Sequence, residues 1–237
     1  HDSGIELLEL INEILDLAKI EAGKMSVQVG GIFLQRIQNW AVRGFQQMAD
    51  NKNIKFVTEL DSTLPKTILT DEKRLQQVIK NFLSNAIKFT NDGHVTLSIY
   101  YAQTGWSPRS QYLNEASTVV AFSVSDSGIG IATDKHKVIF EAFQQADGST
   151  SRKYGGTGLG LSISREIAAL LAGEIVMHSE EGKGSTFILY IPHSYPDQRE
   201  DNDSELPDYS NENNTNAPLS TNTCLLYTSD AADDLFR

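Results

Sequence analysis

Two hydrophobic periods alternate along residues 25–192, and this alternation restricts the possible fold more than any other feature of the sequence. In some stretches the apolar residues recur every second position, as in strands, and in others every three or four, as in helices. A helix has one apolar stripe and a sheet has an apolar face, so each can cover the other. The alternation therefore predicts an α/β sandwich in which helices cover one face of a sheet. Strands are expected at 25–30, 54–59, 66–70, 94–101, 118–125, 173–179 and 185–191, and helices at 33–50, 71–89 and 158–171.

Two segments flank this body. Residues 5–20 carry apolar side chains at alternating spacings of three and four, which predicts an amphipathic, coiled-coil-like helix that ends near Gly23. This helix either packs on its own domain or forms one arm of a helical hairpin that pairs with another chain. From about Pro196 the periodic pattern stops. The last residues, CLLYTSDAADDLFR, resemble translated sequencing-adapter read-through and are left out of the fold prediction.

The formal net charge of −11 is unevenly distributed. From His193 onward the chain has ten acids and two arginines, a net charge of −8, so −3 remains for residues 1–192. The first part therefore offers no basic stripe for nucleic acid, and the second is predicted to be a solvated acidic linker. Because Cys224 is the one cysteine, an internal disulfide is impossible and a reducing compartment is expected. No apolar run approaches the ~18 residues of a membrane span. His1 is not a natural first residue, so we expect a fragment of a longer protein.

The expected helix at 71–89 has a polar face in addition to its apolar stripe. The stripe predicted to be buried consists of Leu75, Val78, Ile79, Phe82, Leu83, Ala86 and Ile87. Asn81, Asn85 and Lys88 are spaced by four and then three, so they lie on one side of the helix. Asparagine is unfavourable in the middle of a helix because its side chain competes for backbone hydrogen bonds. Amide oxygens suit Mg²⁺, which also binds phosphate oxygens, and a lysine can neutralise a phosphate. These residues either form such a site or a solvated helix face.

The sequence VVAFSVSDSGIGI places an acid at the end of an apolar strand. Asp126 can accept a hydrogen bond from an exocyclic amine such as that of adenine, and Gly128 and Gly130 let a flat ring approach the backbone. Asp and Gly are also ordinary residues of a turn after a strand, so the motif has this second interpretation.

A glycine-rich segment, KYGGTGLGLS, precedes the last expected helix. Gly156, Gly158 and Gly160 bring backbone N–H groups to the helix start, where anions bind favourably. The polar loop before them is expected to be a mobile lid. The segment is not a P-loop, since it lacks the Lys-Ser/Thr pair and no strand immediately precedes its glycines.

The order of these motifs resembles the ATP-binding core of sensor histidine kinases, especially the hybrid kind. NFLSNAIKFT is similar to the family's asparagine box, DSGIGI to its first glycine box and GGTGLGLSIS to its second. IFEAFQQADGSTSRKYGG is similar to the phenylalanine box and lid, and GKGSTFILYIP to the closing strand. Phe140 and Phe143 are expected to serve lid and core packing. ELINEILDLAKIEAGKM resembles the second helix of the family's dimerisation hairpin.

The resemblance implies a fold, cofactors and site residues. The fold is the α+β, two-layer sandwich of the histidine kinase, gyrase and chaperone ATPases, with a mixed sheet, and the cofactors are ATP and Mg²⁺. The residues implied for the metal ion and the phosphates are Asn81 and Asn85, with Lys88 on a phosphate. Those implied for adenine are Asp126, Gly128, Gly130 and Thr186. Those implied for the phosphates are Gly156, Gly158 and Gly160, with Arg152 or Lys153 on the terminal phosphate.

The resemblance also implies a domain organisation and partners. Residues 1–24 would be the second helix of the dimerisation hairpin, 25–195 the ATP-binding catalytic domain and 196–237 the linker. The parent protein would form a homodimer through its hairpin helices and act with a receiver domain or a response regulator, without nucleic acid. This domain would lie in the cytoplasm, and the parent could be anchored in a membrane.

The implied reaction is transfer of the ATP γ-phosphoryl group to a histidine in a phosphorelay. In the related ATPases a glutamate four residues before the metal-binding asparagine activates water, and here that place is Asn81, whose amide cannot act as a base. None of the chain's histidines stands in the family's His-Glu-x-x-x-Pro pattern, so the acceptor and its base are expected outside this fragment. A repair-type ATPase and a nucleotide-binding scaffold that transfers nothing remain as alternatives.

Overall fold

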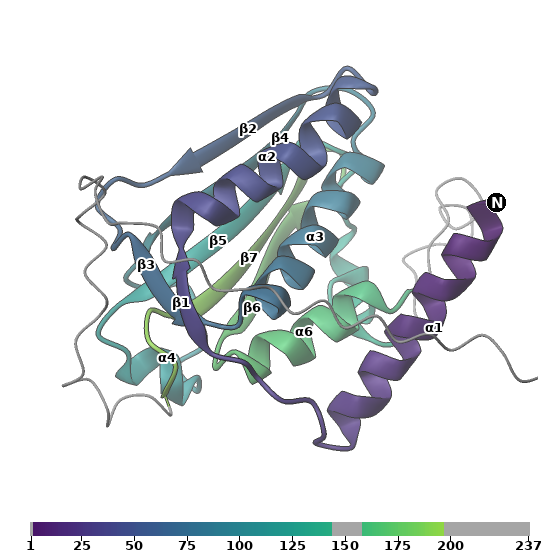
Figure 1. Cartoon of the computed structure of the whole chain (residues 1–237). Helices are drawn as coiled ribbons and strands as arrows, with labels where there is room; N and C mark the ends of the chain where they lie inside the picture. The colour runs from purple at the N-terminus through teal and green to yellow at the C-terminus, as the bar shows by residue number, and fades with distance from the viewer. Residues whose placement is uncertain (1, 144–157, 197–237) are drawn as a thin grey trace, which may run out of the picture. The chain divides into compact units, whose positions relative to one another are not determined.

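The computed structural model describes residues 2–143 and 158–196 and confirms the expected α+β sandwich (Figure 1). Helices lie over one face of the main sheet, and the chain enters this body through the N-terminal helix α1. The elements are α1 (Asp2–Glu21), β1 (Gly30–Phe33), α2 (Leu34–Asp50), β2 (Lys55–Leu60), β3 (Thr67–Thr70), α3 (Glu72–Phe89), β4 (His94–Ala102), α4 (Gln111–Glu115), β5 (Val119–Asp126), the 3-10 helices η1 (Thr133–Lys135) and η2 (Val138–Phe140), α6 (Gly160–Leu170), β6 (Glu174–Glu180) and β7 (Gly184–Pro192).

The main sheet has the strand order β2–β4–β5–β7–β6. β2 and β4 run parallel, whereas the other neighbours pair antiparallel, so the sheet is mixed. Parallel neighbours require a crossover connection, and here the chain passes from β2 to β4 through β3 and α3. This crossover places α3 over the sheet.

α3 is the central helix of the layer, with α2 on one side and α6 on the other (Figure 1). It begins at the N-cap Asp71, whose carboxylate accepts a hydrogen bond from the Arg74 backbone N–H at 3.0 Å. Burial of an aliphatic or aromatic side chain contributes roughly 1.5–3 kcal/mol, so the apolar stripe fixes which side of α3 faces the sheet. The buried stripe is the one that the sequence predicts: Leu75, Val78, Ile79, Phe82, Leu83, Ala86 and Ile87.

The strand expected at 25–30 is displaced in the structure. β1 begins only at Gly30 and pairs antiparallel with β3, outside the main sheet. The physical reason is visible at Gln28, whose backbone N–H donates to the Asp71 carboxylate at 2.8 Å instead of to a neighbouring strand. The N-terminal cap of α3 therefore uses the donor that a longer β1 would need.

The segment expected as a loop at 103–117 contains a short helix, α4, and covers part of the other face of the sheet. Leu113 of α4 packs in a second apolar cluster with Tyr190 of β7. The rings of Trp106 and Tyr190 lie 5.6 Å apart between centroids. Burial raises the pKa of Tyr190 to about 12. This end of the sheet is therefore covered on both faces.

α1 contacts the helical layer through a narrow set of residues. Leu10, Leu17 and Ile20 pack against the main core, and Asp16 accepts a hydrogen bond from Gln77 Nε2 of α3 at 3.0 Å. On the part of α1 whose side chains are described, Leu8 and Leu15 are 62% and 50% exposed. Across the described part of the chain, we find no helix with the length and apolar character needed to span a membrane.

Lys52, in the turn after α2, caps the C-terminal end of α3. Its ammonium donates to the backbone oxygens of Ile87 at 2.8 Å, Lys88 at 3.0 Å and Thr90 at 3.3 Å. A cation at this end of a helix satisfies free carbonyls and opposes the negative pole of the dipole. The cap therefore supports the last turn of α3, which carries Lys88.

We expect Lys52→Met to lower the free energy of unfolding by about 1 kcal/mol, the upper range for an exposed helix-terminal charge. The exposed Lys55, for which the described residues offer no side-chain hydrogen bond, gives the matched control Lys55→Met. Urea unfolding measures both. Equal free energies for the two variants would show that the Lys52 cap adds nothing.

Candidate functional site

The polar edge of α3 faces α6. Asn81 Nδ2 donates to Ser164 Oγ of α6 at 2.9 Å, and Asn85 Nδ2 donates to Asn81 Oδ1 at 3.2 Å. Both asparagines and Lys88 are half-buried, so this edge is not a freely solvated face. Burial lowers the pKa of Lys88, and a poorly hydrated ammonium attracts an anion more strongly than one in bulk water. The three residues that the sequence singled out therefore lie on one partly enclosed edge.

Asp126 lies at the end of β5, between Val95 of β4 and Ser185 of β7 in the strand register. Its carboxylate accepts a hydrogen bond from the Gly128 backbone N–H at 2.8 Å. Burial raises the pKa of Asp126, and the N–H groups of Gly128 and Ser185 offset part of this rise. Among the residues described, no ion pair neutralises this carboxylate. A partly buried acceptor of this kind suits a donor such as an exocyclic amine.

The loop that follows Asp126 packs tightly against two other segments. A Cβ at Gly128 would lie 2.6 Å from the Phe89 carbonyl oxygen, and Gly130 has a φ of 67° with a Cβ position that overlaps the Glu180 carbonyl. Ile131 N–H donates to Ser179 Oγ at 2.8 Å, and Gly182 N–H donates to Ile129 O at 2.8 Å. Glycine is needed at both positions because the loop is held between the end of α3 and the β6–β7 turn.

The second glycine segment lies only partly within the described residues. Gly158 O accepts a hydrogen bond from Phe143 N–H at 3.1 Å, which joins the two ends of the segment between them. Gly160 begins α6, and a Cβ there would lie 2.5 Å from Asn81 Oδ1, so α6 and α3 approach closely at this point. The other residues predicted for this part of the site lie outside the described residues: Arg152, Lys153 and Gly156.

Phe140 and Phe143 differ in their surroundings. Phe140 packs against the core, with its ring centroid 6.4 Å from that of Phe187. Phe143 has a φ of 62° and is 64% exposed. Phe140 is therefore a packing residue, and Phe143 marks the surface at the start of the undescribed segment.

Thr186 does not share a face of the sheet with Asp126. It lies opposite Ser125 in the register, and the two hydroxyl oxygens are 3.0 Å apart. Successive side chains of a strand point to opposite faces, so Ser185, directly opposite Asp126, is the residue on the Asp126 side. Ser185 Oγ also lies 2.9 Å from Ser179 Oγ. Sequence reasoning missed Ser185, Ser179 and Ser164, since a serine in a strand or helix carries no signal without the register.

The donor set can be tested for a divalent cation. Within residues 2–143 and 158–196, no group of three or more His, Cys, Asp or Glu side chains gathers in a way that could hold a metal ion. A cation at this site would therefore depend on amide oxygens and on oxygens brought by a phosphate ligand. Mg²⁺ accepts such a mixed set, so the residues present fit it.

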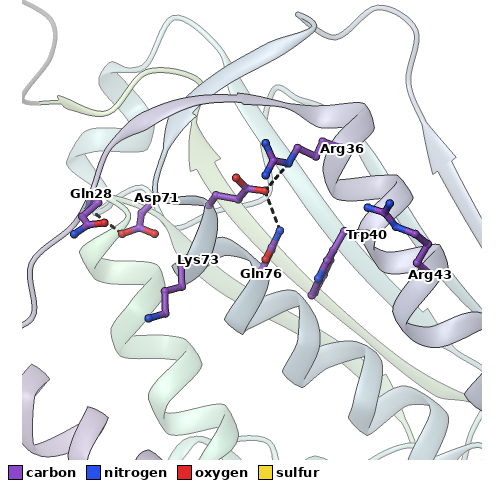
Figure 2. A pocket seen from close by; sticks show the side chains of 8 residues that line it. Gln28, Arg36, Trp40, Arg43, Asp71, Lys73 and Gln76 are labelled. Atoms are coloured by element: carbon purple, nitrogen blue, oxygen red, sulfur yellow. Dashed lines mark hydrogen bonds and ion pairs between the residues drawn. The ribbon is translucent and has the colours of Figure 1, made fainter. Parts of the chain in front are cut away.

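A separate hollow of about 520 Å³ lies over the N-terminal part of α3 (Figure 2). Arg36 and Arg43 of α2 line it with Asp71, and its polar groups largely pair with one another: Arg36 Nε lies 3.1 Å from Glu72 Oε1. None of the residues predicted from the sequence lines it. The candidate site is therefore the edge formed by α3, the start of α6 and the loop after β5.

The comparisons with known proteins bear on the same region. A family model described as "Histidine kinase-, DNA gyrase B-, and HSP90-like ATPase" matches residues 70–195. Hybrid signal transduction histidine kinase B of Dictyostelium discoideum is 37% identical over 82% of this chain, and the circadian input-output histidine kinase CikA of Synechococcus elongatus is 40% identical over 81%. The chain spans 9% and 24% of the lengths of these two relatives.

A solved structure has a similar fold. Full-length ShkA, crystallised in complex with AMPPNP, superposes with a TM-score of 0.67 at 32% identity, over 81% of this chain and 36% of that one. The region that the family model matches, residues 70–195, includes the polar edge of α3, the loop after β5 and the start of α6.

Proposed function

Because the chain belongs to the histidine kinase-, DNA gyrase B- and HSP90-like ATPase family and contains its ATP-binding domain, we propose that it is the catalytic core of a sensor histidine kinase. It transfers the γ-phosphoryl group of ATP to a histidine on a dimerisation hairpin. The named relatives, one of them a hybrid kinase, support this reading within the family.

The choice of a kinase over a hydrolase rests on one observation: Asn81 occupies the position where the related ATPases have a catalytic glutamate. An amide cannot remove a proton from water, and both polar atoms of this amide are already engaged, by Ser164 and Asn85. Catalysis then depends on placing an external nucleophile in line with the terminal phosphate and on neutralising charge. In this proposal Asn85 contributes to Mg²⁺, whereas Asn81, which the resemblance implied as a second metal residue, is engaged by Ser164 and Asn85 and orients Asn85 instead. Lys88 contributes to a phosphate, Asp126 accepts from the adenine amine, and Gly158 and Gly160 border the phosphates.

One adjustment to the implied adenine contacts is based on the strand register. Ser185 replaces Thr186 as the closing-strand residue near adenine, because it lies across from Asp126. Arg152, Lys153 and Gly156 stay as proposed phosphate contacts.

The kinase proposal also implies partners for this chain. α1 would be the second helix of the hairpin, and its exposed Leu8 and Leu15 would face other hairpin helices in a homodimer. A receiver domain or response regulator would accept the phosphoryl group. We propose that this domain lies in the cytoplasm, where ATP and response regulators are available.

We expect that this chain alone neither hydrolyses ATP briskly nor labels itself, yet phosphorylates a supplied hairpin. The ATP site is proposed to be complete, but no histidine of the chain stands in an acceptor motif. The experiment uses radiolabelled ATP with the chain alone, with the parent's acceptor hairpin, and with that hairpin after its histidine is replaced by alanine.

Label only on the intact hairpin supports the kinase proposal. Rapid release of phosphate by the chain alone would favour the ATPase alternative. Measured ATP binding without label on a folded hairpin would favour the scaffold alternative.

A further inference from the structure

Three side chains form a hydrogen-bonded relay from α6 to α3. Ser164 Oγ–H donates to the Gly160 carbonyl at 2.8 Å, Asn81 Nδ2 donates to Ser164 Oγ at 2.9 Å, and Asn85 Nδ2 donates to Asn81 Oδ1 at 3.2 Å. Ser164 is 2% exposed, so water does not compete for its hydroxyl. The relay lies at the point where a Cβ on Gly160 would press on Asn81.

The direction of every bond in this relay is set by Ser164. A hydroxyl has one hydrogen, and here the Gly160 carbonyl takes it, so Ser164 Oγ can only accept from the next group. The Asn81 amide must therefore turn its NH₂ toward Ser164 and its oxygen toward Asn85. In an asparagine the positions of oxygen and nitrogen are decided by such partners alone, since the two groups have the same shape.

We propose that Ser164 is a positioning residue for Mg²⁺–ATP, which acts through Asn81 on Asn85; this inference rests on the proposed function. Since Asn81 presents an oxygen, Asn85 turns its NH₂ inward, and its own oxygen is left for an external ligand. No hydrogen bond to Asn85 Oδ1 occurs within residues 2–143 and 158–196. Mg²⁺ binds amide oxygen, whereas a reversed amide would present NH₂ to it.

The close approach of α6 to α3 supports the relay independently. A side chain at position 160 would separate the helices, and the Cβ of the smallest one would lie 2.5 Å from Asn81 Oδ1. The two helices are therefore held near enough for a short serine side chain to reach across. The same close approach holds the glycine-rich start of α6 against the polar edge of α3, where Mg²⁺ is proposed to bind.

Ser162 provides a matched control. It lies on the same helix, is 4% exposed and donates its hydroxyl to the Leu159 carbonyl at 2.8 Å, but it has no hydrogen bond with Asn81. Ser162→Ala and Ser164→Ala therefore each remove one buried hydroxyl that donates to a backbone carbonyl. Only Ser164→Ala releases the Asn81 amide.

The test is calorimetric ATP binding, with Mg²⁺ and with EDTA, for wild type and both variants. We expect Ser164→Ala to weaken binding about tenfold with Mg²⁺ and less than twofold with EDTA, while Ser162→Ala keeps the wild-type ratio of the two affinities. Ser164→Thr, which retains the hydroxyl, should restore the ratio. Equal ratios for the two alanine variants would overturn the proposal, and a wild type that does not bind ATP would refute the proposed function itself.

A second measurement needs neither nucleotide nor a variant. In the ligand-free wild type the Asn81 side-chain NH₂, bonded to a buried hydroxyl, should exchange its hydrogens more slowly than the NH₂ of the exposed Asn51 on the surface. Side-chain amide resonances report both rates. Exchange of Asn81 as fast as that of Asn51 would overturn the relay.

Discussion

Replacing Asp126 with asparagine is expected to weaken ATP binding roughly tenfold to a hundredfold, because a hydrogen bond to a charged acceptor is worth about 1.5–3 kcal/mol. In the proposed complex the carboxylate accepts from the adenine amine. Asparagine presents an NH₂ as readily as an oxygen, and an NH₂ cannot accept. GTP should bind poorly to the wild type, since guanine has a carbonyl oxygen in place of the amine. Calorimetric titration of both nucleotides measures these affinities.

Asp61 provides a control with the same local structure. Its carboxylate also accepts a hydrogen bond from the backbone N–H two residues later, Thr63, at 2.8 Å, and it lies away from the candidate site. Asp61→Asn should therefore disturb a similar turn and leave ATP affinity unchanged. If Asp126→Asn binds ATP as tightly as Asp61→Asn, Asp126 is a turn residue only.

The Asp126→Asn substitution should lower ATP affinity without lowering the stability of the nucleotide-free protein. Burial raises the pKa of Asp126 in the folded protein, so ionising this carboxyl costs stability. The loss accumulates as pH rises from the ordinary carboxyl pKa through the raised one, and it is complete above both. Above that window, nucleotide-free Asp126→Asn should unfold at the same or a higher temperature than wild type, which separates lost recognition from misfolding.

Substitution of Gly130 by alanine should reduce ATP affinity at least tenfold. A left-handed backbone costs a non-glycine residue roughly 1–2 kcal/mol, and the new Cβ would overlap the Glu180 carbonyl. The loop after β5 must then shift away from the β6–β7 turn. Because that loop begins at Asp126, the shift displaces the proposed adenine site. ATP titration and thermal unfolding measure the two consequences.

Gly182 separates the two effects of the Gly130 substitution. It also has a positive φ, 80°, but a Cβ there would meet open space. Gly182→Ala should therefore lower the unfolding temperature through backbone strain and leave ATP affinity near the wild-type value. A Gly130→Ala variant that behaves in the same way would show that the close packing against Glu180 does not position the site.

The elements of the fold were largely predictable because their signals are local. The stripe of α3 follows the 3.6-residue period, and its seven buried residues are those expected from the sequence. The position of β1 was not predictable, because it depends on a hydrogen bond between residues far apart in the sequence. The Gln28 backbone N–H donates to the carboxylate of Asp71, 43 residues away. The division of the strands into two sheets has the same non-local origin.

Some residues of the candidate site could likewise be predicted from the sequence, and others could not. Asn81 and Asn85 could be named because asparagine is unusual in the middle of a helix, and Asp126 because DSGIGI resembles the family's first glycine box. The choice between Ser185 and Thr186 could not, since it depends on which residue of β7 pairs with Asp126. Ser164 could not be named either, because its importance arises only where α6 crosses α3.

The hydrogen bond between Phe143 N–H and Gly158 O has an evolutionary consequence. It joins the residues on either side of the intervening segment, so the positions of η2 and α6 do not depend on how long that segment is. Relatives that differ in the number of residues between these two positions should therefore keep η2 and α6 in the same arrangement, so that this part of the sequence can change in length during evolution without rebuilding the sandwich.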